Sequence, residues 1–174
     1  MIRVLKKISL QSVLVWLLIA LLVGIIAYVC FRKGLINKRT LVAFPVLAFY
    51  LSFVAKITVF TRIPTPYPQY AIRLFWSYRA IANGATSIIA EVFWNVVLFI
   101  PIGILLMLIL NCRYDWLVSA VIGLLISSCI ELIQLVFHLG LFEFDDIVHN
   151  TLGAAIGVGL YLLVCLLVKK FRRK

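Results

Sequence analysis

The chain has 174 residues, of which 65% are hydrophobic and only 13% are charged. This apolar share is far above that of an average soluble domain, so the composition excludes a water-soluble globular protein. The formal net charge is +11, and the basic residues flank the apolar stretches. In that position they act as orientation signals and head-group contacts, so we expect no nucleic acid partner.

Five apolar stretches are long enough to cross the hydrocarbon core, which takes about 20 helical residues. The first follows a basic N-terminus, but its apolar run is longer than that of a signal peptide, so we expect it to be retained. The sequence therefore predicts an all-α integral membrane protein, a bundle of about five transmembrane helices. The predicted spans are Leu10–Phe31, Leu41–Thr61, Ser87–Leu110, Trp116–His138 and Ile147–Val168.

The chain divides into three predicted parts. Residues 1–40 form an additional N-terminal transmembrane helix with a basic loop, residues 41–168 form the main transmembrane domain, and residues 169–174 form a basic tail. A cytoplasmic tail places ten basic residues on the cytoplasmic side and six on the other. The positive-inside rule then predicts an N-out, C-in protein of the bacterial cytoplasmic membrane. In this orientation, Arg62–Thr86 and Leu139–Asp146 are the outer loops.

The long outer loop begins with prolines at alternate positions, which force an extended path over residues 63–68. The following segment, Gln69–Ala82, mixes aromatic and aliphatic residues with Arg73 and Arg79. This mixture is typical of a short helix that lies in the membrane interface, and anchoring is its simplest role. Together with Arg62, these arginines flank the predicted outward site, and their guanidinium groups suit a phosphate or carboxylate ligand.

Acidic residues are rare, and none of the six precedes Glu91. Asp115 lies beside Arg113 in a short inner loop, where we expect a solvated turn. An ionisable side chain at membrane depth costs a few kcal/mol, and it usually faces the interior of the bundle. The remaining acidic residues are Glu91, Glu131, Glu143, Asp145 and Asp146.

Helical spacing aligns these acidic residues with other polar groups on three helices. Residues three or four apart share a helix face, and the rise per residue places Asn95 and Glu131 roughly 10–12 Å below the outer surface. We therefore predict a shared ligand-binding site in the outer half of the bundle. Its predicted residues are Glu91, Asn95, Glu131, Gln134, Asp145, Asp146 and Asn150, with Arg73 and Arg79 nearby.

Other interpretations of these polar groups remain open. They could hydrogen-bond across helix contacts and hold the fold together, and one of the two aspartates could cap the fifth helix. In an enzymatic version, Glu131 or Asp146 would be the general base, and the polar amides would position the substrate. No known metal-ligand spacing connects His138 and His149, so we expect no metal and no cofactor.

Three motifs occur in order in the last three predicted helices. Residues 95–103 read N-x-x-x-F-x-P-x-G, residues 131–134 read E-x-x-Q, and residues 145–153 read D-D-x-x-x-N-T-x-G. Together they resemble the VanZ-like family of membrane proteins. His149 departs from that pattern, since an apolar residue is usual there, and the first span looks like an addition before the shared core.

The resemblance implies a role in the cell envelope, because one member of the family is associated with low-level resistance to the glycopeptide teicoplanin. We expect the partners to be the lipid bilayer and an amphiphilic envelope molecule or glycopeptide. The alternative is a non-catalytic accessory or scaffold that binds another membrane protein through its helices. The motif GxxxG at Gly153–Gly157 motivates that alternative, although packing within the chain explains it equally well.

Overall fold

The computed structural model describes residues 9–110 and 116–172. Within these ranges, five helical segments are long and apolar enough to cross a membrane, which confirms the predicted all-α membrane fold. The interpretation of Asp115 and Arg113 lies outside the described residues. The segments are α2 (Leu10–Arg32), α3 (Lys38–Ala55) continued by the π-helical turn η1 (Lys56–Phe60), α5 (Ser87–Leu110), α6 (Trp116–Val136) and α7 (Phe144–Phe171).

The helix ends differ from the predicted spans by a few residues. α6 ends at Val136 instead of His138, and His138 has a left-handed backbone with φ of 54°. α7 begins at Phe144, three residues before the predicted start, because its first turn lies against the loop structure at that end. The start of α3 is set by Asn37, whose side chain accepts hydrogen bonds from the backbone amides of Arg39 and Thr40.

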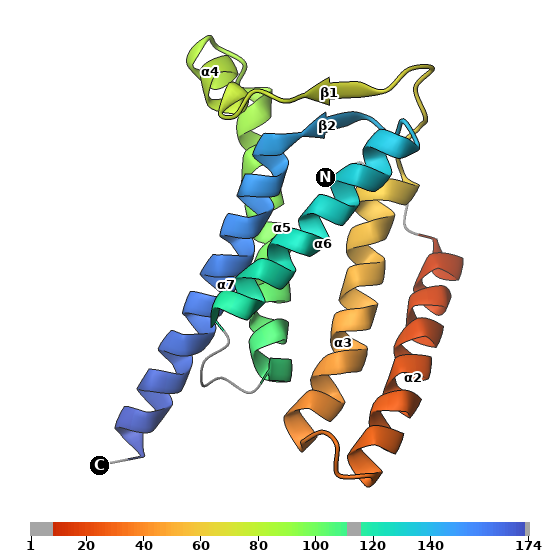
Figure 1. Ribbon diagram of the computed structural model, residues 1–174, viewed down its shortest axis with the longest axis vertical. Helices are drawn as coiled ribbons and strands as arrows, with labels where there is room; N and C mark the ends of the chain where they lie inside the picture. Colours follow the sequence, from red (N-terminus) through yellow and green to blue (C-terminus); the bar gives the residue numbers. More distant parts are fainter. Residues whose placement is uncertain (1–8, 111–115, 173–174) are drawn as a thin grey trace.

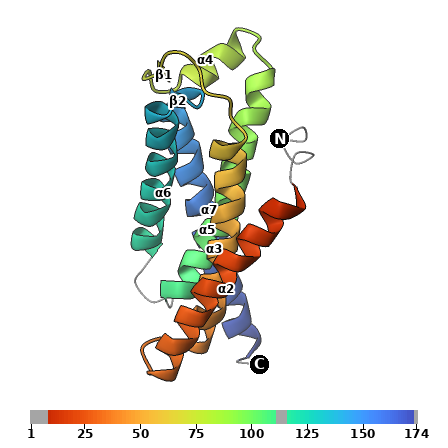
Figure 2. The ribbon, with the colours of Figure 1, turned by 90° about the vertical axis from the view of Figure 1, so that its right-hand side faces the viewer.

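Neighbouring helices contact one another across the bundle: α2 contacts α3, α3 contacts α5, and α7 contacts both α5 and α6 (Figures 1 and 2). The α5–α7 contact is the closest one. A Cβ atom on Gly153 or Gly157 would collide with the carbonyl oxygen of Val96 or Ile100 on α5. The GxxxG pair therefore faces a helix of the same chain, which leaves it no free surface for a partner protein.

A small cap covers one end of the bundle (Figure 1). It consists of strand β1 (Gln69–Ala71), strand β2 (Leu141–Glu143), which pairs with β1 in parallel, and helix α4 (Trp76–Ala82). The predicted helix over Gln69–Ala82 is therefore wrong in its first part. The preceding prolines deliver the chain in an extended form, and β2 offers it an edge with which to pair.

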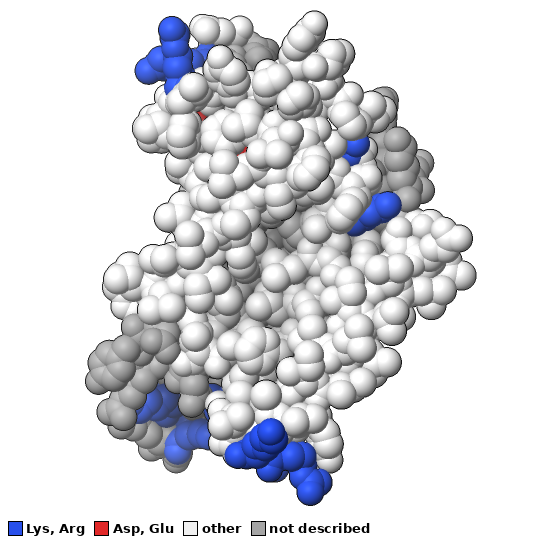
Figure 3. Space-filling view, turned by 45° about the vertical axis from the view of Figure 1, so that its right-hand side comes forward, with Lys and Arg blue, Asp and Glu red and all other residues white. Residues whose placement is uncertain are grey.

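The surface agrees with a membrane location. Figure 3 shows lysine and arginine side chains gathered toward the two ends of the molecule, with a broad uncharged band between them. Most of the large apolar side chains of α2 are exposed, such as Leu21 at 59% and Ile26 at 64%. Such a surface is stable in lipid and not in water, so it supports a multi-pass membrane protein.

Candidate functional site

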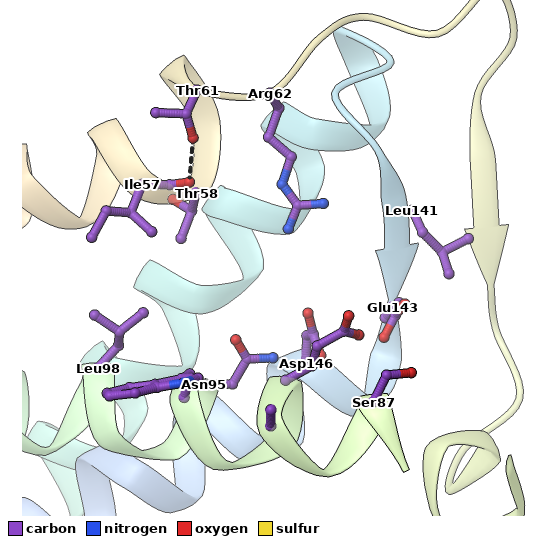
Figure 4. A pocket seen from close by; sticks show the side chains of 13 residues that line it. Ile57, Thr58, Thr61, Arg62, Ser87, Asn95, Leu98, Leu141, Glu143 and Asp146 are labelled. Atoms are coloured by element: carbon purple, nitrogen blue, oxygen red, sulfur yellow. Dashed lines mark hydrogen bonds between the residues drawn. The ribbon is translucent and has the colours of Figure 1, made fainter. Parts of the chain in front are cut away.

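A cavity of about 720 Å³ opens beneath the cap, between the α3–η1 helix, α5, and the start of α7 (Figure 4). We call it the Arg62 pocket, because the side chain of Arg62 extends into it from the end of the α3–η1 helix. The pocket brings polar groups together near the cap and apolar groups farther along α5. It is lined by Ile57, Thr58, Thr61, Arg62, Ser87, Ala90, Glu91, Trp94, Asn95, Leu98, Leu141, Glu143 and Asp146.

Three acidic side chains line the cap end of the pocket. The carboxyl groups of Glu143 and Asp146 hydrogen-bond to each other, and Asp146 also interacts with the side-chain amide of Asn95 (Figure 4). The Glu91 carboxyl lies close enough to both to affect them electrostatically, and Arg62 interacts with Asp146 from the other side. The predicted residues Glu91, Asn95 and Asp146 therefore do come together.

The cap residue Glu143 has an altered acidity. Burial raises its pKa to about 8, and the nearby carboxyl groups of Asp146, Glu131 and Glu91 act in the same direction. Glu143 therefore holds its proton at neutral pH and donates a hydrogen bond to Asp146. This arrangement lowers the charge that the pocket must carry when it is empty.

Glu131 lies behind the pocket rather than on its wall. Its side chain is only 2% exposed, and its carboxylate accepts a hydrogen bond from the backbone amide of Glu143 at 3.0 Å. It is still close enough to Asp146 and Arg62 to interact with both electrostatically. Glu131 therefore positions β2, which carries a pocket residue.

Two other predicted residues, Gln134 and Asn150, form hydrogen bonds between helices outside the pocket. The Gln134 amide nitrogen donates to the Thr58 carbonyl at 2.9 Å, and the Asn150 amide nitrogen donates to the Ser127 hydroxyl at 2.9 Å. Gln134 and Asn150 are 2% and 5% exposed, and neither lines the pocket. Their geometry matches the interpretation of these polar groups as links between helices.

Asp145 has a different environment from its neighbour Asp146. Its carboxylate accepts hydrogen bonds from the backbone amides of Phe75 and Ser77, at 2.5 and 2.9 Å, and from the Ser77 hydroxyl at 2.6 Å. It therefore caps the start of α4 and fastens the cap to α7, instead of capping the fifth span as the sequence suggested. One turn later, His149 hydrogen-bonds the Tyr78 hydroxyl at 3.0 Å and strengthens the same attachment.

The arginines of this region also differ in whether they line the pocket. Arg73 and Arg79 are exposed on the cap and do not line the pocket, whereas Arg62 does. The predicted site residues omitted Glu143, and Arg62 was expected only as one of three arginines that flank the site, although both residues carried a usable signal. Arg62 directly follows the second span, and Glu143 is the acidic residue nearest the two aspartates. The ligand-binding role of each of these residues remains a prediction.

Histidine, cysteine and acidic side chains are the groups that could bind a metal ion. Within residues 9–110 and 116–172, no three His, Cys, Asp or Glu side chains are arranged to hold a metal ion. The chemistry available to the pocket is therefore hydrogen bonding and charge pairing by carboxyl, amide and guanidinium groups.

Comparison with known proteins gives the family. A family model described as VanZ/LLP1 matches residues 13–165, which include every residue that lines the pocket. Protein VanZ of Enterococcus faecium is 34% identical over 80 residues, a region that covers 44% of this chain and 47% of that protein. The alignment thus spans about half the length of that relative, and no solved structure matches this chain.

The extent of the family match decides the assignment. It begins within α2 and ends near the C-terminal end of α7, so it takes in all five membrane helices. The separate N-terminal part, residues 1–40, remains a prediction. Because the match covers most of its length, the chain belongs to the VanZ/LLP1 family.

Proposed function

We propose that this protein contributes to cell-envelope function, including protection from the glycopeptide teicoplanin, by binding an amphiphilic envelope molecule in the Arg62 pocket. The observation that carries the proposal is the open cavity of about 720 Å³ in which Arg62, Asn95 and Asp146 converge. Groups that served only to join helices would fill the space between them, as Gln134 and Asn150 do. A roomy cavity with convergent polar groups is typical of a ligand site.

The pocket is polar at one end and apolar at the other. Ser87 and Leu98 mark its two ends along α5, a separation of roughly 16 Å at the usual helical rise. The charged groups lie nearer Ser87 and the cap, whereas Ile57, Trp94 and Leu98 form the apolar wall. An amphiphile fits this gradient, with its head group beneath the cap and its apolar part directed toward the bilayer centre.

The predicted N-out, C-in orientation places the cap on the outer side of the cytoplasmic membrane. In that orientation, a pocket beneath the cap is reached from the outer leaflet. The link to teicoplanin rests on the family resemblance, and the pocket supplies a location for it.

Binding alone accounts for the geometry. Of the two candidate general bases, Asp146 lines the pocket, whereas Glu131 lies behind its wall and accepts the backbone amide of Glu143. An enzymatic version of this site would therefore use Asp146.

The test replaces pocket groups in a bacterial host that produces each variant at the same membrane level. Arg62→Gln and Asp146→Asn are expected to lower the inhibitory concentration of teicoplanin toward that of cells without the protein. Gln69→Ala is the matched control, because Gln69 is exposed in the same cap and does not line the pocket. Unchanged protection in both pocket variants would reject the proposal.

A further inference from the structure

Acidic residues outnumber basic ones around the Arg62 pocket, and the charged groups of opposite sign lie on different walls. Glu91, Glu143 and Asp146 line it together with one basic residue, Arg62, and Glu131 lies directly behind. This is most of the acidic content of a chain that has only six acidic residues and a net charge of +11. Basic residues are plentiful elsewhere, so their scarcity on this wall is a specific feature of the site.

From these oppositely charged walls, and resting on the proposed function, we infer that the ligand has a zwitterionic head group with an ammonium group and an adjacent phosphate or carboxylate. The ammonium group lies against the carboxyl groups of Glu91 and Asp146. The anionic group lies against the Arg62 guanidinium, and the apolar part lies along Trp94 and Leu98.

Partial enclosure favours an ammonium group, because Asp146 is half-buried while Glu91 is exposed at the mouth of the pocket. A carboxylate taken out of water is stable only when it is paired, and a partly enclosed site strengthens each pairing. The proton that Glu143 shares with Asp146 satisfies part of this need within the chain. Glu91 and Asp146 still face the cavity, and an ammonium group offers three donors to such acceptors.

The opposite wall fits an anionic group. Arg62 lies at the end of η1, and its guanidinium extends into the cavity toward Asp146 without filling the space between them (Figure 4). A guanidinium binds phosphate or carboxylate with two parallel hydrogen bonds, which a lysine at this position could not match. The two charged walls face each other, so a head group with both charges can contact both at once.

The competing cation is a metal ion, and the geometry argues against it. Within the described ranges of the chain, no three acidic, histidine or cysteine side chains are arranged around one point. An ammonium group needs no such convergence, because its donors can be satisfied by carboxyl groups that stand apart.

The experiment measures head-group preference with probes that share one alkyl chain. The full chain, purified in a maltoside detergent, is mixed with equal amounts of octyl phosphoethanolamine and octyl methyl phosphate, and native mass spectrometry reports the occupancy of each. These probes differ in the ammonium group. We expect octyl phosphoethanolamine to be favoured about tenfold, since a charge-assisted hydrogen bond of moderate strength changes affinity by that factor. O-octylserine, which pairs an ammonium group with a carboxylate, distinguishes an amino-acid head group from a phospholipid one.

Variants assign the preference to the two walls. Glu91→Gln or Asp146→Asn should bring the occupancy ratio close to one, whereas Glu91→Asp, which keeps the charge, should preserve it. Glu91 is exposed near the cap end of α5, so its replacement should not disturb packing. Arg62→Gln should lower the occupancy of both phosphate probes by a similar factor.

The outcomes separate this inference from the proposed function. Equal occupancy of the two phosphate probes in the wild type, no occupancy by any probe, or a preference that survives both Glu91→Gln and Asp146→Asn would overturn the zwitterion inference. If the zwitterion inference failed in one of these ways but the pocket variants still lost teicoplanin protection, the proposed function would stand. A clear ammonium preference together with unchanged teicoplanin protection in the pocket variants would support the zwitterion inference and reject the proposed function.

Discussion

Two regions of this bundle contain similar polar residues and use them differently. The seam between α6 and α7 is closed: Gly123 meets Ala154, and Asn150 hydrogen-bonds Ser127. The gap between the α3–η1 helix and α5 is bridged where the Tyr50 hydroxyl donates to the Leu98 carbonyl at 2.9 Å. Closer to the cap, the same gap widens into the Arg62 pocket.

The difference follows from what each helix presents to its neighbour. Small residues let α6 and α7 approach until a side-chain amide and a hydroxyl meet. In the open gap, the hydroxyl groups of Thr58 and Thr61 donate instead to the Val54 and Ile57 carbonyls of their own helix. A polar side chain therefore joins helices where the opposite backbone is close, and it remains available to a ligand where that backbone is distant.

The largest effect is expected at the close contact between α5 and α7. A Cβ atom on Gly157 would collide with the Ile100 carbonyl of α5, so Gly157→Ala should force α5 and α7 apart. Overpacking of this kind costs about 2–3 kcal/mol, which should appear as a lower unfolding temperature in detergent. The control is Gly159→Ala, because a Cβ atom there meets nothing within 4 Å. Equal unfolding temperatures for the two variants would show that the contact between α5 and α7 does not depend on glycine.

A smaller effect should separate the two asparagines. Asn150→Ala leaves the buried Ser127 hydroxyl without its donor and should lower stability by about 1–2 kcal/mol. Asn95→Ala should change stability by less than about 0.5 kcal/mol, because Asn95 faces an open cavity, but it should weaken teicoplanin protection.

Thermal unfolding and inhibitory concentration, measured on both variants, check this contrast. Adding Ser127→Ala to Asn150→Ala should recover part of the lost stability, since the orphaned hydroxyl is then removed. If Asn95→Ala destabilised the protein as much as Asn150→Ala, the distinction between seam and pocket would fail.

The sequence predicted most of the fold, because membrane helices are set by the local length of apolar runs. It also brought Glu91, Asn95 and Asp146 to one place, since helical spacing and depth are regular. It did not distinguish Asn95 from Asn150. That distinction depends on how near the opposite helix lies, which is a property of packing rather than of spacing.

The loops limited the prediction of the remaining site residues. Arg62 enters the pocket from the end of η1, and Glu143 enters from a strand whose pairing with β1 joins segments about 70 residues apart. Asp145 is turned away from the pocket by its bonds to the start of α4. None of these directions follows from a hydrophobic pattern, because each is set by contacts between distant segments.

The smallest predicted effect concerns the pH dependence of the pocket. In the folded protein, the pKa of Glu143 is about 8, above its ordinary value of 4.5, because the group is buried beside the carboxyl groups of Asp146, Glu131 and Glu91. Between these two values the folded state keeps a proton that the unfolded state has released. Stability should therefore fall as pH rises from about 4.5 to about 8 and then level off.

Glu143→Gln isolates this contribution, since glutamine keeps the shape of the protonated acid and cannot ionise. One proton changes the free energy of unfolding by at most about 1.4 kcal/mol per pH unit. Water that enters the open pocket should reduce the total change over this pH range to about 0.5 kcal/mol. Unfolding temperatures at pH 5, 7 and 9 check the difference between this variant and the wild type. A variant that follows the wild-type curve would mean that Glu143 is ionised in the folded protein. The pocket would then carry one more negative charge, and its need for an ammonium group would be correspondingly greater.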